Sequence, residues 1–207
     1  MWKRMIIRAW PLRRAPGTRN EDGMRLQSKM FHELTTRELY EILKARAEIF
    51  VVEQNCVYQD LDDRDYQSLH VFFEEENRVT AYLRAFWKAD GCVQMGRVLT
   101  MRHGTGLGGR LLREGITQIR DKLNPERIYL EAQCYAVGFY EREGFRVCSG
   151  EFLEDGIPHV GMELVIPEAP QKKSETEAAA STADEASADA AATKASTAST
   201  AAAAKTE

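Results

Sequence analysis

Residues 95–110 read MGRVLTMRHGTGLGGR and contain four glycines within six residues, a glycine-rich loop from 104 to 109. Residues 95–100 are predicted to end an extended strand, and a helix is predicted from Arg110 to about Leu123. Glycines allow the backbone to approach an anion closely, and the free N–H groups at a helix start point toward it. We therefore interpret the loop as a cradle for a phosphate or diphosphate group. A flexible turn with a helix cap is the alternative.

The loop matches neither of two common nucleotide-binding patterns. No Gly-Lys-Ser/Thr follows it, as a Walker loop requires. An antiparallel meander rather than a β-α-β unit is predicted before it, which excludes a Rossmann fingerprint. The meander is predicted from strands at 70–73, 79–87 and 92–100, with a hairpin signal at Asp90-Gly91 between the last two.

The other elements follow from capping and periodicity signals. Thr35-x-x-Glu38 reads as a capping box, and apolar residues at helical spacing then predict a helix over 36–51. After the loop we predict a strand at 128–132, a short helix at 137–143, and strands at 145–149 and 159–165. This order predicts an α+β fold, an α/β/α sandwich around a mixed sheet.

The two ends of the 207-residue chain differ in composition from its middle. Residues 1–29 carry a net charge of +6 and are predicted to be a disordered extension or a start artefact, with organellar targeting as the alternative. Residues 168–207 are rich in Ala, Ser and Thr and are predicted to be a disordered tail. The domain at 30–167 carries −7, which argues against a nucleic-acid-binding core and favours a cationic substrate or partner.

Composition also limits location and metal binding. No stretch approaches the ~20 apolar residues of a membrane span. The four cysteines form no Cys-x-x-Cys pair, so we predict reduced, mostly buried thiols in a reducing, cytoplasmic compartment and no metal site. The acidic run at 60–65 lacks the Gly and Glu of a calcium loop. It is predicted to be a solvated acidic loop, with substrate recognition as the alternative.

A second signal follows the strand at 128–132. It consists of Gln133 and the run FYEREGF at 139–145. In this order and spacing the two signals resemble the GNAT superfamily of acetyl-CoA-dependent N-acetyltransferases. The phosphate-loop pattern of that superfamily, Gln/Arg-x-x-Gly-x-Gly/Ala, falls on His103, Gly106 and Gly108, and its Leu/Phe-Tyr-Glu-x-x-Gly-Phe signature falls on 139–145.

Within the superfamily the chain resembles the ElaA-like subfamily over essentially all of 31–165. Four stretches carry this resemblance: 39–48, 50–62, Ala132-Gln133 and the DGIPH run at 155–159. The last stretch ends at His159, for which a pocket role and a packing role are equally expected. The resemblance implies a mostly antiparallel sheet with splayed central strands, flanked by helices.

The resemblance also implies an activity. Acetyl-CoA would be the cosubstrate, and the acetyl group would pass to a primary amine by direct attack in a ternary complex. The acceptor would be a small molecule or a peptide, with no nucleic acid or membrane as partner, and a homodimer is left open. The residues implied in binding acetyl-CoA are Val98, Leu99, Thr100, His103, Gly104, Thr105, Gly106, Leu107, Gly108, Gly109 and Gln133.

The implied catalytic residues move protons. Tyr140 would protonate the leaving thiolate. A free lysine amine has a pKa of about 10.4, so the attacking amine must lose a proton. Glu53 and Glu131 are the two candidates for the group that takes it.

The sequence also allows two functions other than catalysis. A non-catalytic acyl-CoA-binding module is favoured by His103, which stands where Arg or Gln is usual, and by a strand-to-loop junction about two residues shorter than usual. It would bind CoA without turnover. An interaction protein whose two tails matter more than its body would have no affinity for CoA.

Overall fold

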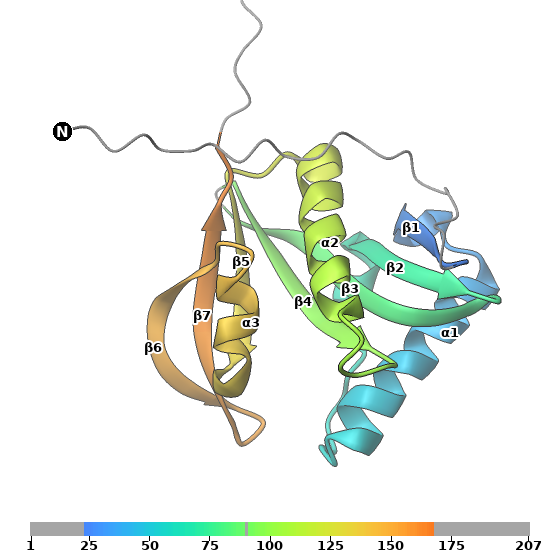
Figure 1. Cartoon of the computed structure of the whole chain (residues 1–207), viewed down its shortest axis with the longest axis horizontal. Coiled ribbons are helices and arrows are strands. Elements are labelled where there is room, and N and C mark those ends of the chain that lie inside the picture. Colours follow the sequence, from blue (N-terminus) through green and yellow to red (C-terminus); the bar gives the residue numbers. More distant parts are fainter. Residues whose placement is uncertain (1–22, 90, 168–207) are drawn as a thin grey trace, which may run out of the picture. The chain divides into compact units, whose positions relative to one another are not determined.

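A computed structural model describes residues 23–89 and 91–167 of the chain (Figure 1). In this part seven strands form one sheet, in the order β1-β2-β3-β4-β5-β7-β6. Only β4 and β5 pair in parallel; every other neighbouring pair is antiparallel. The strands are β1 (Arg25–Met30), β2 (Leu69–Glu75), β3 (Arg78–Ala89), β4 (Cys92–Thr100), β5 (Arg127–Gln133), β6 (Arg146–Glu154) and β7 (Ile157–Val165). The predicted fold class is confirmed.

The first strand differs from the prediction, which placed the domain start at residue 30. β1 pairs with β2 along its whole length, so the domain begins at least five residues earlier. The strand lies at the sheet edge, where Leu26 is buried in the main core and the partly buried Met30 packs against it. The polar Ser28 stands between these two residues, so the strand gives only a weak hydrophobic period. The predicted extensions at 1–22 and 168–207 lie outside the described residues.

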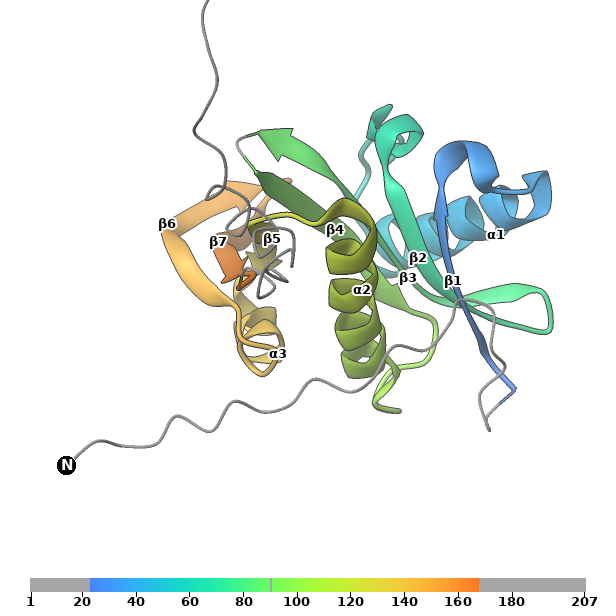
Figure 2. The same ribbon diagram turned by 90° about the horizontal axis from the view of Figure 1, so that it is seen from above.

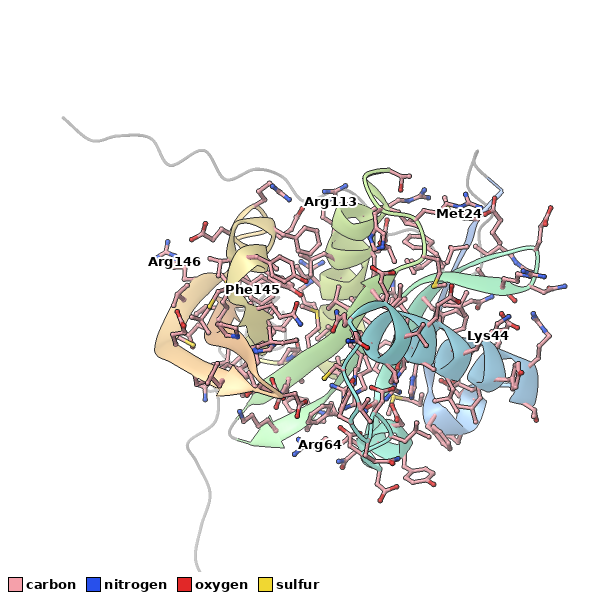
Figure 3. The ribbon with its side chains drawn as sticks, turned by 90° about the horizontal axis from the view of Figure 1, so that it is seen from below. Met24, Lys44, Arg64, Arg113, Phe145 and Arg146 are labelled. Carbon is pink, nitrogen blue, oxygen red and sulfur yellow. The ribbon has the colours of Figure 1, made fainter. Side chains whose placement is uncertain are left out.

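The first helix begins where the capping box predicts. The Thr35 side chain accepts a hydrogen bond from the Glu38 N–H at 3.2 Å, and the Thr35 N–H donates to Glu38 Oε2 at 2.9 Å. α1 (Thr36–Arg46) then continues as a wider π-helical segment, η2 (Ala47–Glu53), two residues beyond the predicted end. One side of this helix packs on the sheet, whereas Lys44 is exposed on the other side (Figure 3).

Two helices cover opposite faces of the sheet (Figure 2). Tyr82 of β3 packs with the apolar side of α1, while its neighbour Leu83 packs with α2 (Leu107–Leu123). Gly115 of α2 lies so close to β3 that a Cβ atom there would come within 2.4 Å of Leu83 Cδ2. α2 is therefore held tightly against the middle of the sheet.

The sheet divides between β4 and β5. These strands pair only over 92–94 and 127–129, and then they diverge, as Figure 1 shows. β4 also carries a bulge, because Arg97 and Val98 together lie opposite one residue of β3. Arg97 has a φ of +54°, a left-handed conformation that is uncommon for a residue other than glycine. The divergence and the bulge create the opening in which the candidate site lies.

The remaining described elements are short. They are the 3-10 helices η1 (Phe31–Glu33), η3 (Arg64–Gln67) and η4 (Cys134–Ala136), and the helix α3 (Val137–Glu141). All four cysteines are free, as predicted, but only Cys92 is buried, and Cys148 is exposed. The prediction of mostly buried thiols is therefore wrong. No helix among the described residues is long and apolar enough to cross a membrane.

Candidate active site

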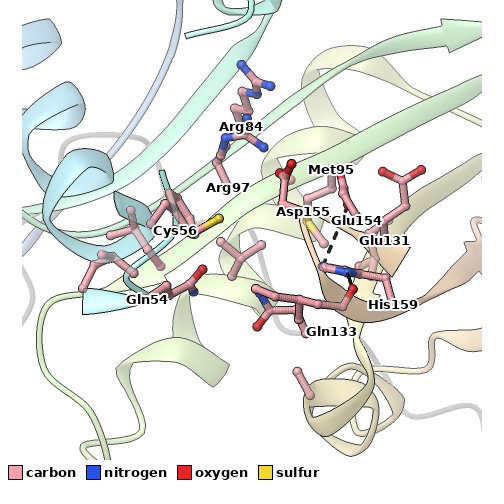
Figure 4. A pocket seen from close by; sticks show the side chains of 18 of the residues that line it. Gln54, Cys56, Arg84, Met95, Arg97, Glu131, Gln133, Glu154, Asp155 and His159 are labelled. Atoms are coloured by element: carbon pink, nitrogen blue, oxygen red, sulfur yellow. Dashed lines mark hydrogen bonds and ion pairs between the residues drawn. The ribbon is translucent and has the colours of Figure 1, made fainter. Parts of the chain in front are cut away.

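A cavity of about 670 Å³ opens where β4 and β5 diverge (Figure 4). Its walls come from β3, β4 and β5, from the segment after α1, from the glycine-rich loop and from the turn between β6 and β7. Nine of the residues expected at the site line it: Glu53, Val98, Leu99, Thr100, His103, Gly108, Glu131, Gln133 and Tyr140. The other expected residues, Gly104, Thr105, Gly106, Leu107 and Gly109, belong to the loop and the first turn of α2 and do not line the cavity.

The glycine-rich loop ends in a helix start without a side-chain cap. Gly106 is the N-cap of α2 and has a φ of +80°, and Gly104 has a φ of +72°. The first bond inside the helix runs from the Arg110 N–H to the Gly106 carbonyl at 3.2 Å. The three N–H groups that precede it have no acceptor within the helix, and the helix dipole makes this end positive. The geometry fits the predicted anion cradle.

His103 and Glu53 meet at the mouth of this loop, although fifty residues separate them. His103 Nε2 lies 3.1 Å from Glu53 Oε1, and their side chains are 66% and 52% exposed. Glu53 is the last residue of η2, so the extra π-helical turn carries it to the loop. One predicted base candidate and the unusual residue of the phosphate loop thus form one polar pair.

Tyr140 reaches the cavity from α3. Its ring packs edge-on against Phe139 and Phe145, with centroids 5.0 and 6.0 Å away. Burial, with a smaller contribution from Tyr135, raises the pKa of the Tyr140 hydroxyl well above its usual value. The hydroxyl therefore keeps its proton at neutral pH and can donate it.

The floor of the cavity beside Tyr140 is β5. Glu131 and Gln133 lie two residues apart on this strand, so both side chains point to the same face of the sheet. Gln94 Nε2 donates to Glu131 Oε2 at 3.1 Å, and the Tyr129 hydroxyl donates to Glu131 Oε1 at 3.3 Å. Both oxygens of the second base candidate already accept a hydrogen bond.

The acidic run at 60–65 is not the solvated loop that the sequence predicts. Asp60 and Asp65 are buried, and the fully buried Arg46 joins them. Arg46 Nε donates to Asp60 Oδ2 at 2.8 Å, Arg46 Nη1 donates to Asp65 Oδ1 at 2.7 Å, and Arg46 Nη2 donates to the Asp60 carbonyl at 2.9 Å. Arginines from distant parts of the chain neutralise the carboxylates, which a local reading of the run cannot show.

Two more arginines complete this group, which we call the Arg46 cluster: Arg46, Asp60, Asp62, Asp65, Arg84 and Arg97. Arg84 of β3 pairs with Asp62 and Asp65, and Arg97 Nε donates to Asp60 Oδ1 at 2.6 Å. Burial raises the pKa of Asp60, but Arg46, Tyr58 and Arg97 outweigh it and hold the pKa below its usual value. The cluster therefore fixes the side chain of Arg97, the residue at the β4 bulge, to the loop before β2.

Sequence reasoning missed the roles of Arg84 and Arg97, both of which line the cavity. Neither belongs to the patterns that the sequence offers, and only the pairing of β3 with β4 brings them together. His159 also lines the cavity, which favours the pocket role over the packing role. Among the residues that the structure describes, no group of His, Cys, Asp and Glu side chains could hold a metal ion.

Comparison with known proteins agrees with this geometry. The matches place the protein in the class of acyl-CoA-dependent acyltransferases. The chain belongs to the family described as the acetyltransferase (GNAT) domain, whose model matches residues 36–166.

Two curated relatives resemble the chain over most of their own length. Protein ElaA of Escherichia coli is 34% identical over 136 residues, which are 63% of this chain and 89% of ElaA. A UPF0039 protein of Mycobacterium tuberculosis is 41% identical over 138 residues, which are 63% of this chain and 86% of the relative. The predicted resemblance to ElaA is confirmed.

Two crystal structures share the fold. An acyl-CoA N-acyltransferase from Pseudomonas aeruginosa is 35% identical with a TM-score of 0.64, and the match covers 68% of this chain and 98% of that one. Escherichia coli ElaA is 31% identical with a TM-score of 0.64, covering 67% and 98%. The family match over residues 36–166 contains β2 to β7, which include all the strands around the cavity.

Proposed function

We propose that the protein transfers an acetyl group from acetyl-CoA to a primary amine by direct attack in a ternary complex. One observation carries the proposal: Gly108 in the uncapped first turn of α2, the β4 bulge and Tyr140 line a single cavity. This transfer requires an anion site, a row of backbone polar groups and a protonated hydroxyl.

In this proposal the cosubstrate lies along β4. The N–H groups at the start of α2 bind its diphosphate, since a helix start favours anions. Val98, Leu99 and Thr100 pair through their backbone with the pantetheine arm, and Gln133 steadies the arm from β5. A backbone N–H at the bulge polarises the thioester carbonyl, as a donor in an oxyanion hole does.

Protons move in two places. The attacking amine must lose a proton, because an ammonium group has no lone pair to donate. Glu53 and Glu131 are the carboxylates that the sequence offers for this step. Tyr140 protonates the CoA thiolate as the carbon–sulfur bond breaks; its raised pKa keeps the hydroxyl protonated until that step. No covalent enzyme intermediate is needed, so the cysteines have no part in the reaction.

A non-catalytic acyl-CoA-binding module is the second candidate, and the His103–Glu53 pair favours it. In that pair His103, which stands where Arg or Gln is usual, already has the carboxylate of Glu53 as a neighbour. A diphosphate would have to compete with Glu53 for the imidazole. The two candidates differ in turnover, because the module would bind acetyl-CoA and release no CoA.

The experiment is a thiol-release assay on the full chain with acetyl-CoA and the probe amines spermidine, lysine amide and tyramine. We expect amine-dependent CoA release. The Tyr140→Phe variant should bind acetyl-CoA as well as the wild type and lose about 10²–10⁴-fold in kcat. Binding without release for every probe amine would favour the module. Wild-type kcat in Tyr140→Phe would remove Tyr140 from its role.

We also propose a cytoplasmic enzyme whose acceptor is a small-molecule or peptide amine. The net charge of −7 over residues 30–167 supports a cationic acceptor. Cell fractionation tests the location, and a membrane or organellar fraction holding most of the protein would contradict it.

A further inference from the structure

His159 faces the cavity from β7. Its register partner on β5 is Gln133, and its partner on β6 is Phe152, whose ring stacks on the imidazole with centroids 6.1 Å apart. The side chain is only 9% exposed, yet it lines the cavity. In Figure 4 it lies beside Glu154 and Gln133. The ring is thus held on two sides and faces the same cavity as Tyr140.

A backbone carbonyl fixes the tautomer of this ring. His159 Nδ1 lies 2.8 Å from the Ile157 carbonyl oxygen. A carbonyl oxygen can only accept a hydrogen bond, so Nδ1 carries the proton and Nε2 of the neutral ring holds a lone pair. The Ile157 carbonyl therefore leaves Nε2 as the basic atom.

A carboxylate stands at the right distance to stabilise the ring after it takes up a proton. Glu154 Oε2 lies 3.8 Å from His159 Nε2, too far for a hydrogen bond but within ion-pair range. Other titratable groups that line the cavity from the neighbouring elements are Asp155 in the β6–β7 turn, Glu131 on β5 and Tyr135 on η4.

The two carboxylates expected from the sequence are engaged elsewhere. Glu131 accepts a hydrogen bond on each oxygen, and Glu53 pairs with His103 at the loop. His159 Nε2 lies beyond hydrogen-bond distance of Glu154, and its lone pair is left for a substrate proton because Nδ1 donates to the Ile157 carbonyl. His159 is therefore better placed to accept a proton than either glutamate.

We propose that His159 Nε2 is the general base that deprotonates the acceptor amine, with Glu154 stabilising the imidazolium. This inference rests on the proposed transfer from acetyl-CoA. The N–H bond of the ammonium breaks and its proton moves to Nε2. The nitrogen lone pair then forms the N–C bond while the C–S bond breaks. Sulfur takes a proton from Tyr140, which regains one from the amide nitrogen, and His159 releases its proton to solvent.

The test compares His159→Asn with wild type in the thiol-release assay from pH 6 to pH 10. The Asn amide can still donate to the Ile157 carbonyl, so the variant removes the base and keeps that hydrogen bond. We expect kcat/KM for spermidine to fall about 100-fold at pH 7 and to approach wild type at pH 10, where much of the ammonium loses its proton without a base. His32→Asn, an exposed histidine outside the cavity, is the matched control and should retain wild-type kcat/KM.

Two further measurements separate a base from a structural residue. The affinity for acetyl-CoA and the Tm of His159→Asn should match those of wild type. In Glu154→Gln, loss of the nearby anion should move the midpoint of the acidic limb of the pH profile of kcat/KM, where the base loses its proton, to lower pH. This second variant keeps the inference testable if His159→Asn does not fold.

The outcomes are distinct. If wild type releases no CoA with any probe amine, the proposed function fails first. If wild type turns over and His159→Asn matches it at pH 7, the proposed function stands and His159 is not the base. A deficit of His159→Asn that is equally large at pH 7 and pH 10 would also overturn the proposal, because it would indicate misplacement rather than a lost base. Glu154→Gln without any shift of the midpoint would remove Glu154 from its role.

Discussion

Replacing Arg46 with methionine should destabilise the domain more than any exposed substitution on the same helix. Arg46 is fully buried and donates three hydrogen bonds, to both Asp60 and Asp65. Removing one partner of a buried ion pair typically costs about 3–5 kcal/mol, because the other charge stays buried without compensation. Arg97 still pairs with Asp60, and Arg84 still pairs with Asp65. We therefore expect a loss of unfolding free energy at the lower end of this range, about 3 kcal/mol.

Urea unfolding of the full chain followed by far-ultraviolet circular dichroism measures this loss. A loss of that size corresponds to a fall in Tm of about 10 °C for a domain of this length. Lys44→Met is the matched control, since Lys44 is exposed two residues away on α1, and it should change the free energy of unfolding by no more than about 0.5 kcal/mol. The reasoning is refuted if Arg46→Met loses less than about 1 kcal/mol, the value of an exposed pair.

A double variant tests whether the loss comes from the ion pair. In Arg46→Met with Asp65→Asn, one of the two buried carboxylates that lose Arg46 as a partner is also neutralised. The double variant should therefore be more stable than the sum of the two single losses predicts, by about 0.5–3 kcal/mol. Strict additivity would mean that Arg46 stabilises the domain by packing alone.

Two other predictions concern packing and pH. Gly115→Ala places a Cβ within 2.4 Å of Leu83 Cδ2, so it should lower the free energy of unfolding by about 1–3 kcal/mol, and an unchanged urea midpoint would contradict this. Stability should fall below about pH 6.5, because burial lowers the pKa of His70 and the unfolded chain then takes up protons that the folded chain does not. A second fall should begin near pH 4, because Arg84 outweighs the effect of burial and lowers the pKa of Asp62 to about 2. Urea midpoints that stay level from pH 7 to pH 3 would contradict both.

Local signals in the sequence predicted most of the fold. The capping box at Thr35, the hairpin signal before β4 and the glycine-rich start of α2 each depend on neighbouring residues, and the structure has all three elements there. β1 was missed because it is a short edge strand in which the polar Ser28 separates its two core residues, Leu26 and Met30. The acidic run was misread because its partners, Arg46, Arg84 and Arg97, come from three other elements.

Part of the candidate site could be predicted from the sequence, whereas Arg84, Arg97 and the contacts within the site could not. The resemblance to a family nominated Tyr140, Glu53 and Glu131, and all three line one cavity. Glu53 meets His103 because of the π-helical turn η2, and the hydrophobic periodicity of the sequence does not predict such a turn. The orientation of His159 depends on the backbone carbonyl of Ile157, two residues away. This detail of turn geometry cannot be predicted from the residue types.

Binding of acetyl-CoA tests the central claim, that the cavity between β4 and β5 takes an acyl-CoA. The measurement is thermal unfolding of the full chain with and without acetyl-CoA, with adenosine as the control that lacks the diphosphate and the thioester. The account predicts a rise in Tm that grows with acetyl-CoA concentration, equivalent to about 2.7 kcal/mol at one hundred times the Kd. An unchanged Tm at millimolar acetyl-CoA would contradict it.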